Sequence, residues 1–220
     1  MYYNYNYYMN ISDDILEKIF NYLSRNEILL FSLISQENYF RYYKSNIFIP
    51  KNNFELKQAV NLWCKDKNIA IQKYGDISIW NTELITDMSY LFMNKLDFND
   101  NISNWNTDNV TNMKKMFCCA FNFNININNW NISKVTDMES MFASASKFNR
   151  NLDNWNISNV NNMMNMFSYA YEFNQNLNNW KVNNNVNTND MFLYAKNFNT
   201  QSNYFTPQKN INCIPKFYKS

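Results

Sequence analysis

The side chains that most often carry catalysis are absent or isolated in this chain. Histidine is missing from all 220 residues, and histidine is the commonest general base and the commonest neutral metal ligand. Catalysis of the Ser-His-Asp and Cys-His types is therefore excluded. The cysteines contain no Cys-x-x-Cys pair, the spacing of many zinc sites; they are Cys64, Cys118, Cys119 and Cys213. We expect free structural or surface thiols, no metal, no cofactor and no enzymatic activity.

Asparagine recurs directly after phenylalanine at fixed intervals. Its amide both donates and accepts hydrogen bonds, so a row of such residues could bind a ligand or could satisfy backbone groups of neighbouring segments. We favour the second interpretation, a structural ladder of buried amides at a corner of the fold, and keep ligand binding as the alternative. The pairs are Phe98-Asn99, Phe123-Asn124, Phe148-Asn149, Phe173-Asn174 and Phe198-Asn199.

Large aromatic residues show that the chain contains an array of repeats. Tryptophan returns every 25 residues without insertion or deletion, and a phenylalanine series follows it with the same period. A fixed period of about 20 to 50 residues is typical of stacked repeats, which usually bind other molecules. We interpret the aromatic columns as core and not as a cofactor site. The two series are Trp80, Trp105, Trp130, Trp155 and Trp180, and Phe92, Phe117, Phe142, Phe167 and Phe192.

The middle repeat predicts one extended segment and one helical turn. Apolar residues between Ile127 and Val135 are spaced as in an extended segment with a corner. Beyond Thr136 or Asp137, either of which could cap a short helix, the apolar positions follow a helical face; they are Met138, Met141, Phe142 and Ala145. The sequence therefore predicts an α+β repeat fold: a small N-terminal module of three helices followed by a leucine-rich-repeat-like solenoid of five coils.

Segments on either side of the repeats complete the predicted organisation. A helix is predicted between Asn53 and Cys64, and its apolar face would cover the first coil. That face consists of Leu56, Ala59, Val60 and Trp63. The predicted parts are a flexible N-terminus (1–10), a three-helix module (11–45), a helical connector and cap (46–75), five repeats (76–199) and a C-terminal cap or tail (200–220).

The predicted N-terminal module presents more apolar surface than it could bury by itself. Ser12 could cap a first helix, with Asp13 and Asp14 in its first turn. Domains below about 40 residues normally need additional support, so we expect a partner to cover the apolar row, with packing on the repeats as the alternative. The row and its neighbours are Ile15, Leu16, Ile19, Phe20 and Leu23.

Charge and hydropathy limit where the protein could act. The formal net charge is +2, so strong electrostatic binding to nucleic acid or acidic lipid is not expected. The N-terminus has neither a basic leader nor an apolar run, and no segment reaches the apolar length of a membrane span. We therefore expect an intracellular protein with no nucleic-acid or membrane partner.

The repeats resemble a known family of 25-residue units. Three sequence motifs are similar to those of BspA-like leucine-rich repeats. They are Trp-Asn-Ile-Ser-Lys-Val-Thr-Asp-Met-Glu-Ser-Met-Phe (130–142), the Phe-Asn pairs, and Lys-Tyr-Gly-Asp-Ile-Ser-Ile-Trp (73–80). The resemblance extends from about Leu56 to Asn199. It implies a protein-interaction surface and names no ligand.

The N-terminal segment resembles an F-box. Residues 13–23 read Asp-Asp-Ile-Leu-Glu-Lys-Ile-Phe-Asn-Tyr-Leu, and a leucine-rich segment then ends at Leu33-Ile34-Ser35, although Ser12 stands where that family has proline. F-boxes dock on the Skp-type adaptor of cullin-RING ubiquitin ligases, so the resemblance implies this adaptor as a partner. Carried over by position, the contact residues would be Ile15, Leu16, Ile19, Phe20, Leu23, Leu30 and Ile34.

Together the two resemblances imply a substrate receptor, in which the repeats hold a target protein and the F-box-like segment recruits the ligase. The combination is similar to proteins of giant DNA viruses, which implies the host cytoplasm or nucleus. The alternative is a non-catalytic surface or scaffold protein of the BspA-like type without a ligase link. Target recognition should use positions that vary between coils, and tyrosine and arginine are frequent hot-spot types; the preferred residues are Arg150, Tyr169, Tyr171 and Tyr194.

Overall fold

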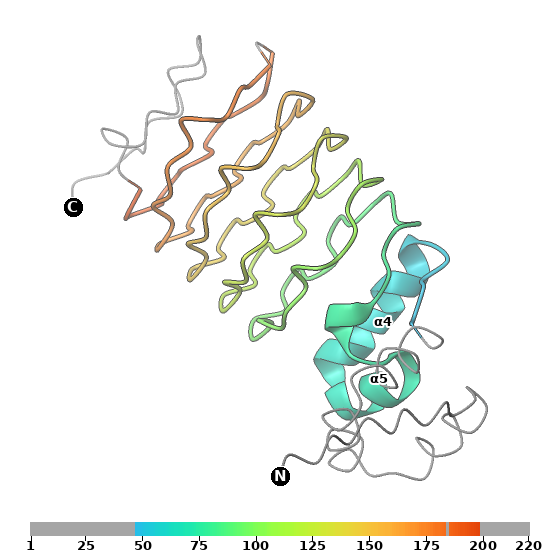
Figure 1. Cartoon of the computed structure of the whole chain (residues 1–220). Coiled ribbons are helices and arrows are strands. Elements are labelled where there is room, and N and C mark those ends of the chain that lie inside the picture. Colours follow the sequence, from blue (N-terminus) through green and yellow to red (C-terminus); the bar gives the residue numbers. More distant parts are fainter. Residues whose placement is uncertain (1–46, 184, 199–220) are drawn as a thin grey trace, which may run out of the picture. The chain divides into compact units, whose positions relative to one another are not determined.

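The repeats form a stack of coils that follows two helices (Figure 1). The computed structural model describes residues 47–183 and 185–198. The chain divides into two compact units, Met1–Ile47 and Phe48–Ser220, and the described elements belong to the second unit. These elements are α4 (Asn53–Lys65), α5 (Lys67–Tyr74) and the 3-10 turn η1 (Ile77–Ile79).

The helix predicted between residues 53 and 64 is confirmed as α4. Asn52 caps it, because its side-chain oxygen accepts a hydrogen bond from the amide of Glu55 at 3.0 Å and so satisfies a free donor of the first turn. The predicted apolar face is buried, and the Trp63 indole packs edge-on against Trp80 at 5.8 Å between ring centroids. Burial of this apolar surface holds α4 against the first coil.

Two residues direct the chain from α4 into the stack. Asp66 ends α4 by donating its amide to Leu62 at 2.7 Å, and its side-chain oxygen caps α5 by accepting from the amide of Ile69 at 3.1 Å. Gly75 ends α5 with a φ of 71°. Because glycine has no Cβ, it adopts this left-handed conformation without steric penalty. The chain can therefore reverse into η1 and the first coil.

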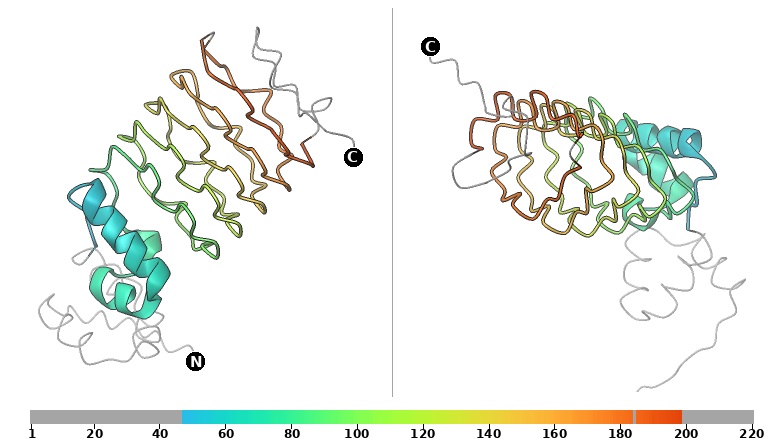
Figure 2. Two further views of the ribbon diagram at one scale, coloured as in Figure 1. Left: turned by 180° about the vertical axis from the view of Figure 1, so that it is seen from behind. Right: turned by 90° about the horizontal axis from the view of Figure 1, so that it is seen from above.

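Successive repeats lie parallel and in register, as Figures 1 and 2 show from three directions. Isolated parallel bridges join equivalent positions of neighbouring coils. The bridged pairs are Asp87 with Asn112, Asn112 with Asp137, Asp137 with Asn162, and Asn162 with Asn187. Each coil therefore uses the next one as its hydrogen-bonding partner, as expected for a repeat that cannot be stable alone.

The second half of each coil has an alternating backbone pattern. In the middle repeat, the amide of Ser140 donates to Met164 of the next coil at 2.8 Å, whereas the amide of Met141 donates within the coil to Met138 at 3.1 Å. Ser140 and Ser144 have φ angles of 55° and 59°. These two left-handed residues, four positions apart, prevent the chain from continuing as a right-handed helix. Amides that an α-helix would use internally therefore point to the neighbouring coil.

This backbone shows that the predicted α+β fold class is wrong. The described residues contain two α-helices and one 3-10 turn and no strand, so a leucine-rich-repeat-like coil with a strand and a helical turn is not present. The expected helix after Thr136 is replaced by turns, and the expected extended segment contributes only isolated bridges. The described residues show no three-helix module either, since residues 11–45 lie outside them.

The aromatic series form the core, as predicted. Phe117 and Phe142 of adjacent coils stack with 5.6 Å between ring centroids and an interplanar angle of 7°. Each later tryptophan also ties its coil to an earlier one: Trp105 donates its indole N–H to the carbonyl of Ile77 at 2.8 Å, and this bond recurs in the following coils. A buried indole N–H needs such a partner. The aromatic columns thus bury apolar surface and also provide hydrogen-bond acceptors for the buried indole N–H groups.

Asparagine has a structural role at repeated positions. The predicted ladder after phenylalanine is confirmed, since the side-chain oxygen of Asn124 accepts the amide of Asn149 at 3.0 Å and Asn149 accepts that of Asn174 at 3.0 Å. The ladder lies at the surface, however, since its asparagine side chains are half-buried or exposed. Other asparagines close turns within a coil, as when Asn131 accepts the amide of Ser133. Turn formation thus accounts for much of the asparagine in the repeats.

Within the described ranges, no helix is long and apolar enough to cross a membrane.

Candidate interaction surface

The structure locates only part of the predicted binding residues. The seven residues expected to contact a Skp-type adaptor lie in segment 11–45, outside the described residues. They are Ile15, Leu16, Ile19, Phe20, Leu23, Leu30 and Ile34. The residues expected to bind a target, Arg150, Tyr169, Tyr171 and Tyr194, all lie on the described coils.

Three of the residues predicted to bind a target form one cluster. The rings of Tyr169 and Tyr194 lie 4.8 Å apart between centroids, and those of Tyr169 and Tyr171 lie 6.3 Å apart at 77°. Lys196 extends the cluster, because its ammonium lies 5.0 Å from the centre of the Tyr171 ring. Tyr169 and Tyr171 remain 40% and 39% exposed. Large rings that are accessible and held by neighbours are well suited to bind a protein.

Arg150 does not join this cluster. Its Nε donates to the backbone carbonyl of Asn124 in the preceding coil at 2.7 Å. Within the described part of the chain it makes no cation–π contact with the three tyrosines. Its observed contact links two coils at the asparagine ladder, so the structure separates it from the other predicted target-binding residues.

Two exposed apolar residues of the same corner were not among the predicted contacts. Leu96 and Phe121 are 47% and 43% exposed and occupy the register position of Tyr171 in the first and second coils. Their corner is continuous, because the Leu96 carbonyl accepts the amide of Asn122 and the Tyr171 carbonyl accepts that of Asn197. Alignment of the repeats would have revealed the position, since it varies between coils. We call this the corner strip: Asn94, Leu96, Cys119, Phe121, Ser144, Ser146, Tyr169, Tyr171, Tyr194 and Lys196.

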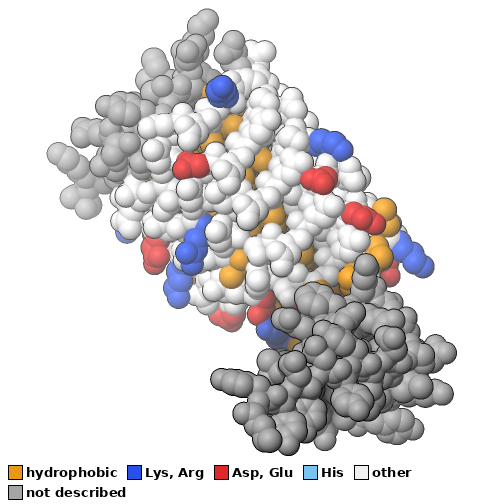
Figure 3. Space-filling view, viewed as in Figure 1, with side chains coloured by type: hydrophobic (Ala, Val, Ile, Leu, Met, Phe, Trp, Pro, Cys, Tyr) orange, Lys and Arg blue, Asp and Glu red, His pale blue; other side chains and the backbone are white. Residues whose placement is uncertain are grey.

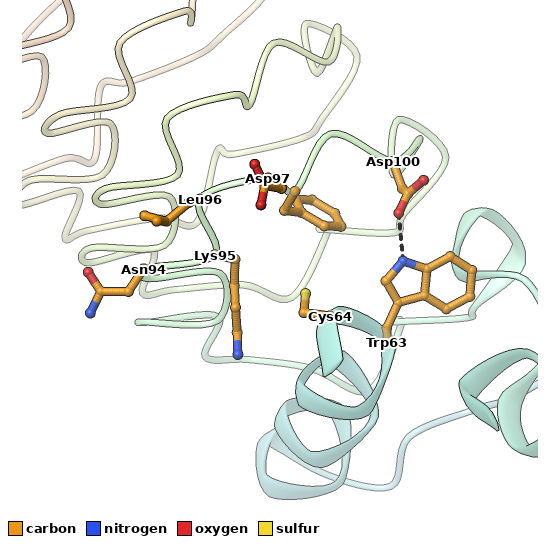
Figure 4. A pocket seen from close by; sticks show the side chains of 8 residues that line it. Trp63, Cys64, Asn94, Lys95, Leu96, Asp97 and Asp100 are labelled. Atoms are coloured by element: carbon orange, nitrogen blue, oxygen red, sulfur yellow. Dashed lines mark hydrogen bonds between the residues drawn. The ribbon is translucent and has the colours of Figure 1, made fainter. Parts of the chain in front are cut away.

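A pocket of about 360 Å³ lies between α4 and the first members of the corner strip (Figure 4). Trp63 and Cys64 line it from α4, and Asn94 and Leu96 line it from the first coil, where Figure 4 shows their side chains directed away from Trp63. The remaining lining residues are Lys95, Asp97, Phe98 and Asp100. The lining is half apolar and half polar or charged, so the pocket is more polar than most pockets for small ligands.

Asp100 fixes the side of the pocket that α4 contributes. Its carboxylate accepts the indole N–H of Trp63 at 2.7 Å, drawn as a dashed line in Figure 4, and pairs with Lys67 at 2.6 Å. The Lys67 ammonium also lies 4.9 Å from the Trp63 ring centre. Burial raises the pKa of the Cys64 thiol to about 11. The thiol is therefore protonated at neutral pH and is a weak nucleophile.

A pair of thiols lies on the second coil. The sulfurs of Cys118 and Cys119 are 3.8 Å apart, and both cysteines and Cys64 are free. Burial, followed by the neighbouring thiol, raises the pKa of Cys118 to about 11. The prediction of free thiols is confirmed for these three residues, and Cys213 lies outside the described residues. Protonated thiols of this kind behave as small apolar groups.

Charge is sparse on the coils. On the face in Figure 3 most of the surface is uncharged, and the Lys, Arg, Asp and Glu side chains lie mainly along its edges, with both signs present. One half-buried ion pair joins adjacent coils, with Lys114 and Glu139 at 2.8 Å, and Asn162 donates to the same carboxylate at 3.2 Å. The bond to Lys114 holds the pKa of Glu139 below its ordinary value, and the same bond raises the pKa of Lys114. This group stabilises the stack electrostatically.

The described surface presents apolar groups and no cluster of metal-binding side chains. No group of three or more His, Cys, Asp or Glu residues that could hold a metal occurs among the described residues. The corner strip instead offers exposed rings and aliphatic groups on a backbone fixed by bonds between coils. Such an arrangement can recognise a partner through shape and apolar contact.

Comparison with known proteins places the repeats in a family. Searches of curated proteins and of solved structures found no significant match. The family model described as Mycoplasma protein of unknown function, DUF285, matches residues 60–163 and again residues 126–220. The two overlapping matches include α5, all described coils and more than half of the chain. The chain is therefore a repeat protein that belongs to the DUF285 family.

Proposed function

We propose that this protein binds a partner protein on the corner strip. The observation that carries the proposal is the row of exposed side chains at one register position, Leu96, Phe121 and Tyr171, which continues into the tyrosine cluster. Exposed aromatic residues on a rigid support bind with little loss of conformational entropy. The mostly uncharged surface around them is consistent with recognition by shape and apolar contact rather than by strong charge.

We further propose that the bound partner is a target for ubiquitination. The F-box-like sequence of residues 13–35 supports this proposal, since a segment of this type would recruit a Skp-type adaptor and its cullin-RING ligase. The protein would then act without catalysis, as the link between target and ligase, in the cytoplasm or nucleus of a eukaryotic host. The target and the adaptor would occupy different parts of the chain.

The test is affinity purification of the full-length tagged chain from a eukaryotic host cell. We expect a Skp-type adaptor and a cullin to co-purify with the wild type. Ile19→Asp should abolish this, because a carboxylate in an apolar contact is costly to bury, whereas Lys18→Asp places the same group on an adjacent polar position and should leave it intact. Equal recovery of the adaptor with Ile19→Asp would refute docking through the F-box-like segment, and absence of adaptor and cullin from the wild-type material would refute the ligase link.

Target binding is tested separately. Replacing Tyr169 and Tyr171 together with serine should remove the target from the purified material while adaptor and cullin remain. Tyr90→Ser, at a different register position, is the matched control. Retention of every co-purified protein by the double variant would refute the corner strip as the binding surface.

A surface or scaffold protein without a ligase link is the second candidate. It is supported by the family match, which covers the repeats and begins at residue 60, well after the F-box-like segment. This candidate predicts that partners bound to the coils co-purify while no adaptor or cullin does, and that Ile19→Asp changes nothing.

A further inference from the structure

We infer that Cys118 and Cys119 of the second coil form a binding site for one soft, monovalent metal ion of the Cu(I) type. The site is an additional feature of the stack and does not depend on the partner protein. Three observations carry it: the separation of the two sulfurs, the fixed peptide unit between the two residues, and the access of both thiols to solvent.

The two sulfurs have the separation of a ligand pair on one ion. The Sγ atoms of Cys118 and Cys119 lie 3.8 Å apart. Thiolate sulfur is the preferred ligand of soft ions such as Cu(I), and a metal–sulfur bond is about 2.3 Å long, so two sulfurs at this separation subtend an angle of about 110° at the ion. This angle is that of a tetrahedral ion and close to that of a trigonal one. The thiols therefore need to lose their protons but not to move.

The peptide unit between the two cysteines is held from both sides. Its carbonyl, on Cys118, accepts the amide of Asn94 in the first coil at 2.9 Å, and its N–H, on Cys119, donates to Ala143 in the third coil at 2.8 Å. The backbone that carries both thiols is thus fixed before any ion binds. A fixed pair of ligands loses less conformational entropy on binding than a flexible one.

The same constraint disfavours a disulfide between the two residues. The sulfurs would have to approach to about 2.05 Å, and the Cα atoms of a disulfide are usually at least about 4.4 Å apart, whereas those of adjacent residues are about 3.8 Å apart. Closing the ring would therefore strain the peptide unit that links the first, second and third coils. An ion between the sulfurs leaves this unit in place.

Access and ligand number favour a soft monovalent ion. Both thiols are half-buried, so an ion can reach them from solvent. No third cysteine, aspartate or glutamate joins the pair among the described residues, and a structural zinc ion needs four ligands. Cu(I) is satisfied by two or three sulfurs, so a small cellular thiol could complete its shell. The nearby ammonium of Lys115 would offset the negative charge that two thiolates and one monovalent ion leave.

The stack itself does not require these thiols. Ala143 and Ser144 occupy the same two register positions in the third coil, and Ser144 has the same φ of 59° as Cys119. Cys118→Ala and Cys119→Ser therefore copy side chains that the fold already accepts. Each variant removes one sulfur and should leave the backbone unchanged.

The test uses the full-length variant Cys64→Ser with Cys213→Ser, whose remaining thiols are Cys118 and Cys119. Cu(I) alone is added without oxygen, in competition with a chromogenic Cu(I) chelator. We expect one Cu(I) per chain and, by X-ray absorption, a shell of sulfur ligands. Adding Cys118→Ala or Cys119→Ser should lower the affinity at least about a hundredfold, because one of two linked ligands is lost. Cys118→Ala with Ser133→Cys keeps two thiols but on different coils, and should bind as weakly as Cys118→Ala.

Three outcomes would overturn the inference: no Cu(I) retained against the chelator, equal affinity in the variants that keep one sulfur of the pair, or a shell dominated by nitrogen or oxygen. Circular dichroism of each variant confirms that the fold is retained. Target binding is tested separately through Tyr169 and Tyr171, so a failure of the metal site leaves the proposed function standing. Loss of the target from the tyrosine variant likewise leaves the metal site untouched.

Discussion

The indole N–H of Trp130 donates to the carbonyl oxygen of Ile102, 28 residues earlier, at 3.2 Å. The Trp130 side chain is buried and lies against Phe117 with 6.2 Å between ring centroids. One side chain therefore both fills the core of its coil and holds the preceding coil. The same bond occurs at Trp105, Trp155 and Trp180, so the tryptophan column links the coils in series.

Trp130→Ala should reduce the free energy of unfolding by about 3 to 5 kcal/mol, because it removes a large buried ring. Trp180→Ala should cost less, since a terminal coil has fewer neighbours to lose. Trp130→Phe keeps an aromatic ring and loses the N–H, so its free energy of unfolding should lie between those of the wild type and the alanine variant. Urea denaturation followed by circular dichroism measures all three. Equal losses of unfolding free energy at positions 130 and 180 would contradict the expectation that a central coil has more stabilising neighbours than a terminal one.

Ser144→Pro should destabilise the stack by about 3 kcal/mol or more. The native φ of Ser144 is 59°, and its amide donates to Ser168 of the next coil at 2.7 Å. Proline fixes φ near −65° and has no amide hydrogen, so it loses both features. Ser144→Gly is the matched control and should change stability by no more than about 1 kcal/mol, because glycine adopts the left-handed region freely. Thermal unfolding distinguishes the two, and similar losses would disprove the left-handed conformation.

Glu139→Gln should reduce the sensitivity of the stack to acid. The pKa of Glu139 is held below its ordinary value of 4.5, chiefly by the bond to Lys114. A carboxylate whose pKa is lower in the folded state stabilises the fold above the unfolded-state pKa, and this contribution is lost as pH falls through the folded-state pKa. The free energy of unfolding of the wild type should therefore fall by about 0.5 to 1 kcal/mol more than that of Glu139→Gln as pH falls from neutral through the folded-state pKa of Glu139.

Lys114→Gln should produce the same reduced acid sensitivity, because it removes the partner that lowers the pKa of Glu139. Denaturant unfolding at a series of pH values measures the effect in both variants. Parallel pH curves for wild type and both variants would show that the ion pair makes no contribution.

A fragment of residues 46–220 should fold and bind the target but should not promote its ubiquitination. The break is chosen because Phe48 belongs to the folded unit: its ring lies 4.5 Å from Tyr74 and 5.3 Å from Trp80, and its carbonyl accepts the amide of Asn81 at 3.0 Å. Circular dichroism, target pull-down and a ubiquitination assay form the test. Target turnover driven by this fragment would exclude the F-box-like segment as the ligase link.

A fragment that begins at Asn52 is the matched control for folding. It lacks Phe48 and therefore leaves an aromatic contact of Trp80 unfilled. We expect it to unfold at a lower denaturant concentration than the longer fragment. Identical unfolding would show that Phe48 contributes nothing to the first coil.

The sequence by itself determined the stacking register and the core. Tryptophan and phenylalanine recur at a constant interval, and identical units must bury identical side chains against one another. The apolar face of α4 was predictable for a related reason, because Leu56, Ala59 and Val60 have helical spacing inside a segment with good caps. In both cases the information is local or strictly periodic, so it can be read from one chain.

Only the tertiary structure decided the backbone of the coils. The spacing of Met138, Met141 and Phe142 reports which side chains are buried together, and a helix and a series of turns with two left-handed residues four positions apart satisfy it equally. The choice depends on where the amides find acceptors. Because Ser140 and Ser144 donate to residues of the next coil, far away in sequence, the turn series replaces the helix.

The composition of the proposed interaction surface also depended on the tertiary structure. The sequence indicated which positions vary, and Tyr169, Tyr171 and Tyr194 do come together. It did not separate Arg150 from them or connect Leu96 to the α4 pocket. Exposure and contact between variable side chains depend on how the corners of the coils stack, and that stacking is fixed by hydrogen bonds between residues about one repeat apart, whose geometry no local pattern contains.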